Sequence, residues 1–241
     1  FVQGSLRDFN RPQAELMVLS NLFDTADLGL VNKAGAVRLQ DVRGRVVLKE
    51  DAIQIPVLSA RLNRTSLNLS VLWPTKNEAS PIDFQATVPM LEQADLMLLL
   101  GLEGAAPAKK TKARSYRGTV AVNRGTFEKC SYTDLKLEVT YREPSITIPR
   151  FHGKMQGGTF AGSGQFNIAD KKRPLYDIAF RMENVAAESV SPLLDMPKDM
   201  ISGMVSADGR FTAAGAKKSD VIDTLQGAME IKVEKGVLKK V

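Results

Sequence analysis

The sequence predicts a mainly β protein: an elongated, curved antiparallel sheet built from repeats, forming an open β-groove with short helices between its units. Three observations lead to this fold class. Residues 39–82 align without a gap on residues 132–175, at a constant shift of 93 (146 − 53 = 93). Most of the chain alternates apolar and polar residues with period two, and glycine or proline separates the alternating runs. Such arrays present an extended surface, which argues against an enzyme with one deep pocket.

The repeat is carried by chemically matched residues. Asp41 aligns with Asp134, and Ile53-x-Ile55-Pro56 aligns with Ile146-x-Ile148-Pro149. Large apolar residues also coincide, with Leu58, Leu67 and Trp73 falling on Phe151, Phe160 and Phe166. After the two matched prolines, Pro81 and Pro174, the shift becomes 94. Because a slip of one residue turns every side chain of a strand to the other face, a bulge or turn insertion is expected there.

Clear period-two runs predict the strands. They are Ile53-Ile55-Val57, Leu67-Leu69-Val71-Trp73, Phe84-Ala86-Val88, Leu135-Leu137-Val139-Tyr141, Ile178-Phe180-Met182 and Met229-Ile231-Val233. Short helices are expected at 91–100, 186–194 and 220–225, where apolar residues have helical spacing. Residues 105–114 are small and basic, which predicts a mobile loop outside the sheet.

These signals divide the chain into five segments. Residues 1–29 resemble the tail of a preceding unit, 30–101 form one repeat unit, 102–117 form a basic loop, 118–194 form a second unit, and 195–241 begin a further unit. The chain is therefore expected to be a piece of a longer protein.

Composition narrows the chemistry. The net charge of +6 favours anionic partners such as acidic headgroups or nucleic acid without requiring either. One cysteine, Cys130, and one histidine, His152, cannot build a Cys/His zinc cluster. Neither belongs to a nucleophile or general-base motif, and the glycines at 157, 158, 162 and 164 lack the Gly-Lys-Ser/Thr ending of a phosphate loop. We therefore expect no catalytic residues, no metal and no cofactor.

Several stretches together resemble the repeat region of AsmA-family proteins, which are large proteins of the bacterial envelope. These stretches are 118–127, the strand at Leu135-x-Leu137, 155–166, 176–194 and 201–205. The resemblance implies a long antiparallel sheet shaped like a gutter, apolar inside and anchored to the inner membrane through a segment outside this sequence. Such proteins are thought to span the periplasm of Gram-negative bacteria and to let phospholipid tails slide along the groove.

The resulting hypothesis is a lipid-binding module that conducts phospholipid between the inner and outer membranes, with phospholipid acyl chains and possible envelope proteins as partners and no nucleic acid. Period two alone selects the residues expected to line the groove: Ile53, Ile55, Leu67, Leu69, Ile146, Ile148, Phe160, Ile178 and Phe180.

Other functions remain open. A structural or protein-binding β-repeat scaffold in outer-membrane assembly would use sheet edges for strand addition. A basic β-protein that binds nucleic acid or an acidic polysaccharide is a further alternative. A closed sandwich or barrel is a commoner fold for alternating strands, but the 93-residue repeat favours an open groove.

Overall fold

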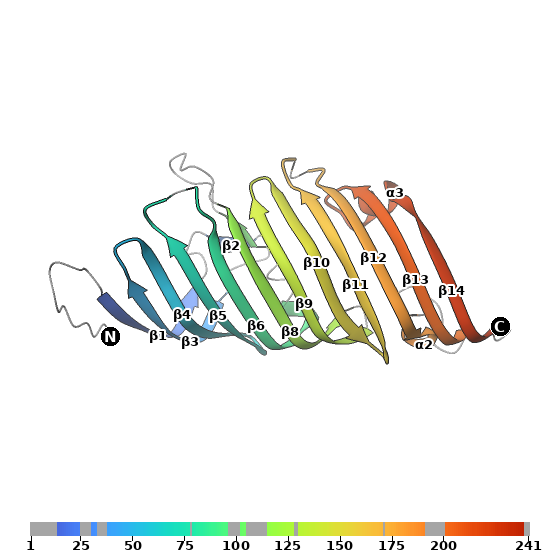
Figure 1. Cartoon of the computed structure of the whole chain (residues 1–241), viewed down its shortest axis with the longest axis horizontal. Coiled ribbons are helices and arrows are strands. Elements are labelled where there is room, and N and C mark those ends of the chain that lie inside the picture. Colours follow the sequence, from blue (N-terminus) through green and yellow to red (C-terminus); the bar gives the residue numbers. More distant parts are fainter. Residues whose placement is uncertain are drawn as a thin grey trace. The chain divides into compact units, whose positions relative to one another are not determined.

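The computed structural model describes residues 14–24, 30–32, 38–77, 79–95, 102–104, 115–127, 130–170, 172–190 and 201–238. The chain is mainly β (Figure 1), with a 12-stranded, mostly antiparallel sheet of order β1-β3-β4-β5-β6-β8-β9-β10-β11-β12-β13-β14. Strands β6 and β8 lie start to start, where the Ile82 N–H donates to the Ser115 carbonyl oxygen at 2.9 Å, so this pair is parallel. The sheet is not closed, since β1 and β14 stand at its two ends. Strands β2 and β7 form a separate two-stranded sheet. The predicted class, mainly β with an open antiparallel sheet, is confirmed apart from the parallel β6–β8 pair.

The strands are long and the described helices are short. The strands are β1 (Ala14–Asp24), β2 (Leu30–Asn32), β3 (Arg38–Leu48), β4 (Ala52–Leu62), β5 (Thr65–Pro74), β6 (Ile82–Leu91), β7 (Leu102–Gly104), β8 (Tyr116–Phe127), β9 (Cys130–Arg142), β10 (Ser145–Met155), β11 (Gly158–Asn167), β12 (Leu175–Ala186), β13 (Ile201–Ala214) and β14 (Gln226–Leu238). The helices are α2 (Ala187–Val190) and α3 (Lys218–Asp223), and residues 93–95 are also helical.

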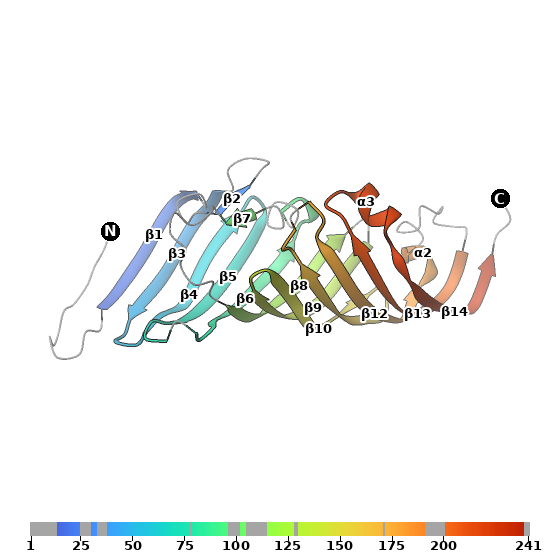
Figure 2. The same cartoon turned by 90° about the horizontal axis from the view of Figure 1, so that it is seen from above.

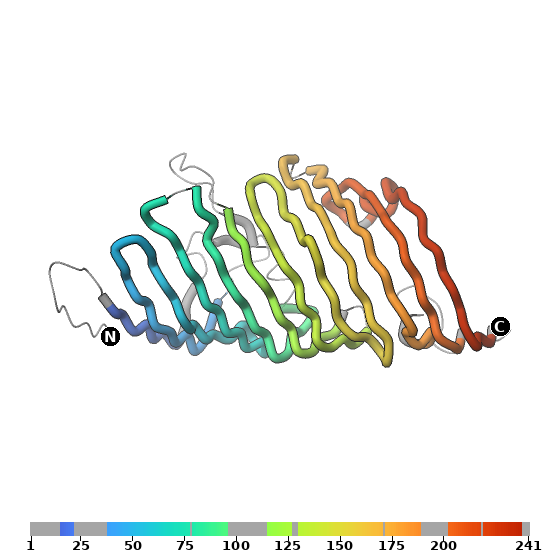
Figure 3. Tube along the Cα trace, in the orientation of Figure 1, coloured from blue at the N-terminus to red at the C-terminus, as the bar shows by residue number. Residues whose placement is uncertain are grey.

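The chain forms two compact units, 1–120 (unit 1) and 121–241 (unit 2), which meet within β8. Each is described by itself. Both contain hairpins of neighbouring strands, such as β4–β5 in unit 1 and β10–β11 in unit 2, as the trace in Figure 3 shows. The strands of unit 2 curve along their length (Figure 2). The division into five segments stays a prediction, and the expected loop at 105–114 lies outside the described residues.

Residues matched at the shift of 93 have matched partners. Ile53 pairs with Trp73 across β4 and β5. The equivalent Ile146 pairs with Phe166 across β10 and β11. The hairpins of the two units therefore share one register, as expected if the sequence repeat is a structural repeat.

The turns repeat as well. In unit 1 the Asn77 Oδ1 accepts a hydrogen bond from the Ala79 N–H at 3.0 Å. In unit 2 the Asp170 Oδ1 accepts one from the Lys172 N–H at 2.9 Å. Both are Asx turns, in which a short polar side chain replaces a backbone acceptor. The same local chemistry thus closes the same hairpin in both units.

The change of the repeat shift from 93 to 94 corresponds to one residue inserted at the end of this turn in unit 2. Leu72 pairs with Asp83, which is 11 residues later (83 − 72). Gln165 pairs with Asp177, which is 12 residues later (177 − 165). One added residue therefore precedes the first matched pair in unit 2, and the apolar side chains of β12 keep their face.

Two kinds of bulge interrupt the ladders. Asp41 near the start of β3 and Asp134 near the start of β9 have positive φ angles of 51° and 54°, next to shifts in register. Asn184 and Lys235 occupy comparable positions in β12 and β14, with φ of 53° and 52°. Asp and Asn tolerate this left-handed conformation better than most residues because their short polar side chains bond locally.

The second kind of bulge corrects one prediction. The registers of β4 and β10 shift between Ile55 and Leu58 and between Ile148 and Phe151, at the two matched prolines. Proline lacks the N–H that a ladder needs, so a central strand accommodates it at a bulge. As a result Val57 pairs with Arg45 and is 58% exposed, so it does not continue the face of Ile53 and Ile55.

The described parts of the expected helices begin at other residues than predicted. Residue 91 ends β6 and residue 186 ends β12, so 93–95 and α2 begin after them, while 96–100 and 191–194 lie outside the described residues. Helix α3 begins two residues before the expected 220, because the Asp220 carboxylate accepts a hydrogen bond from the Lys217 N–H at 3.4 Å and caps the first turn.

Candidate functional site

One face of unit 1 is apolar. Residues directly opposite each other in an antiparallel ladder project from the same face. Ladder pairs on this face are Ile53–Trp73, Ile55–Val71, Leu58–Leu69, Ala60–Leu67 and Val71–Phe84. All four groove residues predicted for this unit, Ile53, Ile55, Leu67 and Leu69, lie on that face.

Unit 2 has the equivalent face, enriched in aromatic side chains and glycine. Its ladder pairs are Ile146–Phe166, Ile148–Gly164, Phe151–Gly162, Gly153–Phe160, Phe160–Met182, Gly162–Phe180, Gly164–Ile178 and Ile178–Phe211. The five predicted residues Ile146, Ile148, Phe160, Ile178 and Phe180 therefore lie on one face.

This face is covered at the strand ends and open between them. In unit 1 Leu62, at the end of β4, is 2% exposed, and Ile82, at the start of β6, is 7% exposed. In unit 2 Val185, near the end of β12, is completely buried, and Ala213, near the end of β13, is 9% exposed. All nine predicted residues are instead half-buried. We call this half-buried apolar stretch between the covered ends the trough of each unit.

A small core closes one end of the trough in unit 2. Val185, Ala187 of α2 and Val205 are buried together, and Met155 and Met182 pack against them. Helix α2 contacts both β12 and β13. Helix α2 has four residues, and the five predicted residues further along the unit 2 strands are half-buried rather than buried.

Period-two reasoning missed several trough residues. Phe151, Tyr176 and Phe211 lie on the same face, and their rings contact other aromatic rings. Phe180 and Phe211 stack with ring centroids 5.8 Å apart. Phe151 could have been predicted from the repeat, because it aligns at the shift of 93 with Leu58. Tyr176 and Phe211 stand opposite Ala213 and Ile178, a pairing that only the register reveals.

Charged side chains lie on the opposite face. Arg210 on β13 donates to both oxygens of Asp177 on β12, with Nε–Oδ1 at 2.8 Å and Nη2–Oδ2 at 2.6 Å. This hydrogen-bonded guanidinium holds the pKa of the Asp177 carboxyl below its ordinary value. In unit 1 the Arg117 Nε lies 2.8 Å from the Asp83 Oδ1 in the same way. Each unit therefore has one apolar and one charged face.

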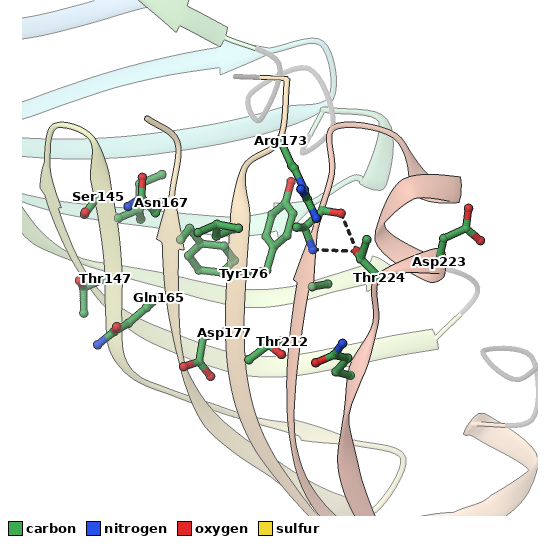
Figure 4. A pocket seen from close by; sticks show the side chains of 16 residues that line it. Ser145, Thr147, Gln165, Asn167, Arg173, Tyr176, Asp177, Thr212, Asp223 and Thr224 are labelled. Atoms are coloured by element: carbon green, nitrogen blue, oxygen red, sulfur yellow. Dashed lines mark hydrogen bonds between the residues drawn. The ribbon is translucent and has the colours of Figure 1, made fainter. Parts of the chain in front are cut away.

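A cleft of about 690 Å³ lies at one end of the unit 2 strands (Figure 4). Its lining includes Phe166, Arg173, Tyr176 and Asp223. The Tyr176 hydroxyl donates to the Gly215 carbonyl oxygen at 3.1 Å. Beside it, the Thr224 hydroxyl accepts from the Ala214 N–H at 2.9 Å and donates to the Ala214 carbonyl oxygen at 2.6 Å, which ties α3 to the end of β13.

His152 and Cys130, the two residues considered for catalysis, differ in burial. His152 is exposed on β10, and Cys130 is buried at the start of β9. Among the described residues, no group of three His, Cys, Asp or Glu side chains is placed to hold a metal ion. Within the same residues, no helix has both the length and the apolar character needed to cross a membrane.

Comparison with known proteins gave no match to a family model, to a curated protein or to a solved structure.

Proposed function

We propose that this chain is a lipid-binding module of the AsmA type, in which the apolar troughs hold phospholipid acyl chains. In this proposal the module belongs to an inner-membrane-anchored protein that spans the periplasm and conducts phospholipid between the two membranes of a Gram-negative bacterium. The observation that carries the proposal is the half-burial of all nine groove residues between covered strand ends. A sealed core would bury them, and a contiguous apolar face that stays half-exposed is typical of a surface that binds an apolar ligand or partner.

The energetics favour an open trough over a closed pocket for transport. Burying one methylene gains ~0.8 kcal/mol, so full burial of an acyl chain of about fifteen carbons would gain ~12 kcal/mol and make release slow. A trough that covers only one side of the acyl chain lowers the free energy gained on binding, so release is faster. Successive cross-strand rows of similar apolar character then provide sites of similar energy, between which a chain moves without crossing water.

Lipid extraction is the direct test. Purified protein is extracted with organic solvent and the extract analysed by mass spectrometry. We expect phospholipid in stoichiometric amounts relative to protein. An extract free of lipid, from protein that also fails to label with a photoactivatable phospholipid, would overturn the proposal.

A matched pair of variants places the lipid. Ile148→Asp puts a carboxylate into the trough of unit 2, whereas Ala161→Asp puts one on the exposed opposite face, where Ala161 stands between His152 and Arg181. Photolabelling should fall for Ile148→Asp and stay at the parent level for Ala161→Asp, with both proteins folded. Because water reaches a half-buried site, the carboxylate stays hydrated there. Unfolding of Ile148→Asp would point to a sealed core instead.

One observation favours the scaffold alternative. Strand β14 ends the sheet order, and Met229, Ile231 and Val233 on it are 45%, 50% and 47% exposed. An exposed apolar edge strand is a template for strand addition. Ala228→Lys tests this reading, because Ala228 is exposed and pairs with Arg210 on the charged face, away from the trough, and a lysine on an edge strand blocks added strands. Loss of a protein partner with lipid binding intact would support the scaffold.

A further inference from the structure

The trough of unit 2 differs from that of unit 1 in one regular way. At the shift of 93, the pair Ala60–Leu67 of unit 1 becomes Gly153–Phe160 in unit 2. The pair Leu58–Leu69 becomes Phe151–Gly162. In the first pair an alanine and a leucine are replaced by a glycine and an aromatic ring, and in the second two leucines are replaced by an aromatic ring and a glycine. The exchange keeps the apolar character and redistributes the volume across the strands.

In each of these pairs the ring reaches over the glycine. A Cβ atom built on Gly153 would lie 2.6 Å from the Cζ atom of Phe160, and one on Gly162 would lie 2.5 Å from the Cζ of Phe151. Both contacts are far below ordinary van der Waals distances, so the tip of each ring occupies the space that an alanine methyl would take. The rings therefore lean across the neighbouring strand and cover the glycine there.

We propose that the Gly153–Phe160 and Phe151–Gly162 pairs set the depth of the unit 2 trough, and that these two leaning rings contact the acyl chain of a bound lipid. The inference rests on the proposed lipid-binding function and names the residues that shape its site. Phe151 and Phe160 belong together, since their ring centroids lie 6.3 Å apart. A substituent on either glycine would lift the ring above it and narrow the trough at this point.

A substitution at Gly153 can test the position of the Phe160 ring without distorting the backbone. The nearest atoms to its added Cβ belong to the Phe160 ring, followed by the Leu135 Cα at 3.3 Å. At Gly162 the added Cβ would also meet the Ala179 carbonyl oxygen at 2.3 Å, which a side-chain rotation cannot relieve. Gly153→Ala therefore displaces a ring, whereas Gly162→Ala distorts the sheet.

The experiment compares four proteins for binding of a diazirine-labelled palmitic acid. They are the parent, Gly153→Ala, the double variant Gly153→Ala/Phe160→Leu, and Ala161→Val, which enlarges an exposed residue of the opposite face on the same strand as Phe160. The double variant recreates the Ala60–Leu67 pair of unit 1. We expect Gly153→Ala to weaken binding by about fourfold for each ligand methylene that loses apolar cover. The double variant should regain part of the lost affinity, because the clash is relieved although one of the two contacting rings is lost, and Ala161→Val should equal the parent.

Urea unfolding of the same proteins, together with the single variant Phe160→Leu, gives a readout independent of lipid. Gly153→Ala should lower the unfolding midpoint when Phe160 is present and have little effect when residue 160 is leucine, because the clash is with the ring. Equal losses in both backgrounds would overturn the ring geometry. Two results would overturn the role of the pair. One is that Gly153→Ala binds palmitic acid as tightly as the parent, and the other is that the double variant binds no more tightly than Gly153→Ala. Absence of palmitate binding by the parent would instead overturn the proposed function.

Discussion

The Nζ of Lys154 lies 2.9 Å from the Oδ2 of Asp134, at the bulge that opens β9. The same pair exists 93 residues earlier, where the Nη2 of Arg61 lies 3.0 Å from the Oδ2 of Asp41. In both units the aspartate has a positive φ angle, so backbone conformation and side-chain partner repeat together. These exposed ion pairs contribute little to stability, and the recurring requirement is the bulge itself.

The first prediction concerns this backbone requirement. Asp134→Val should lower the free energy of unfolding by ~1–3 kcal/mol, because a β-branched residue is strained at positive φ. Asp134→Gly should stay within ~1 kcal/mol of the parent, since glycine adopts this conformation without strain. Urea unfolding measures both. Equal losses for valine and glycine would show that the carboxylate matters more than the backbone.

A row of three valines tests the distribution of burial in unit 2. Val185 pairs with Val205, which pairs with Val233, and their exposed fractions are 0%, 7% and 47%. Val185→Ala should cost about 2 kcal/mol, because it leaves a cavity beside α2. Val233→Ala should cost less than about 0.5 kcal/mol. Val205→Ala should cost nearly as much as Val185→Ala. Thermal unfolding of the three variants should show this order of stability losses. A uniform loss along the row would contradict the closed end of the trough.

Stability should depend on pH through Asp177. Because Arg210 lowers the pKa of this carboxyl in the folded state, the unfolded chain binds the proton more tightly. The stabilisation is therefore present above the ordinary carboxyl pKa of about 4 and is lost as the pH falls through the lower folded value. Asp177→Asn should destabilise the protein at pH 7 and have no effect at strongly acidic pH. In an Arg210→Gln background the substitution should have little effect at either pH.

The proline bulge in β10 leads to a prediction about position. Pro149→Ala should change the free energy of unfolding by no more than ~1 kcal/mol, because a residue at the bulge does not need to donate a hydrogen bond to the neighbouring strand. Thr147→Pro, two residues earlier, should cost ~3 kcal/mol or more, because Thr147 pairs with both Thr140 and Gln165 inside the regular ladder. Hydrogen exchange should show lost protection in β9 and β11 only for Thr147→Pro. Similar losses for both variants would argue against the bulge.

Much of the fold follows from the sequence because its signals are local. Alternation with period two identified strands β4, β5, β6, β9, β12 and β14. The shift of 93 anticipated the shared register of Ile53–Trp73 and Ile146–Phe166. The change of shift after Pro81 and Pro174 also anticipated the added residue before β12. Each of these depends on the order of residues within one hairpin, which the chain itself encodes.

Other features were decided by the tertiary structure. Val57 continues an alternating run, yet the bulge at Pro56 turns it to the exposed face. The sequence alone determined that each unit has an apolar and a polar face. Which residues the covered ends bury, which stay half-exposed in the trough, and which glycine lies beneath which ring depend on registers between strands and on the placement of α2. Those contacts join residues far apart in sequence, and a single bulge resets them, so no local pattern determines them.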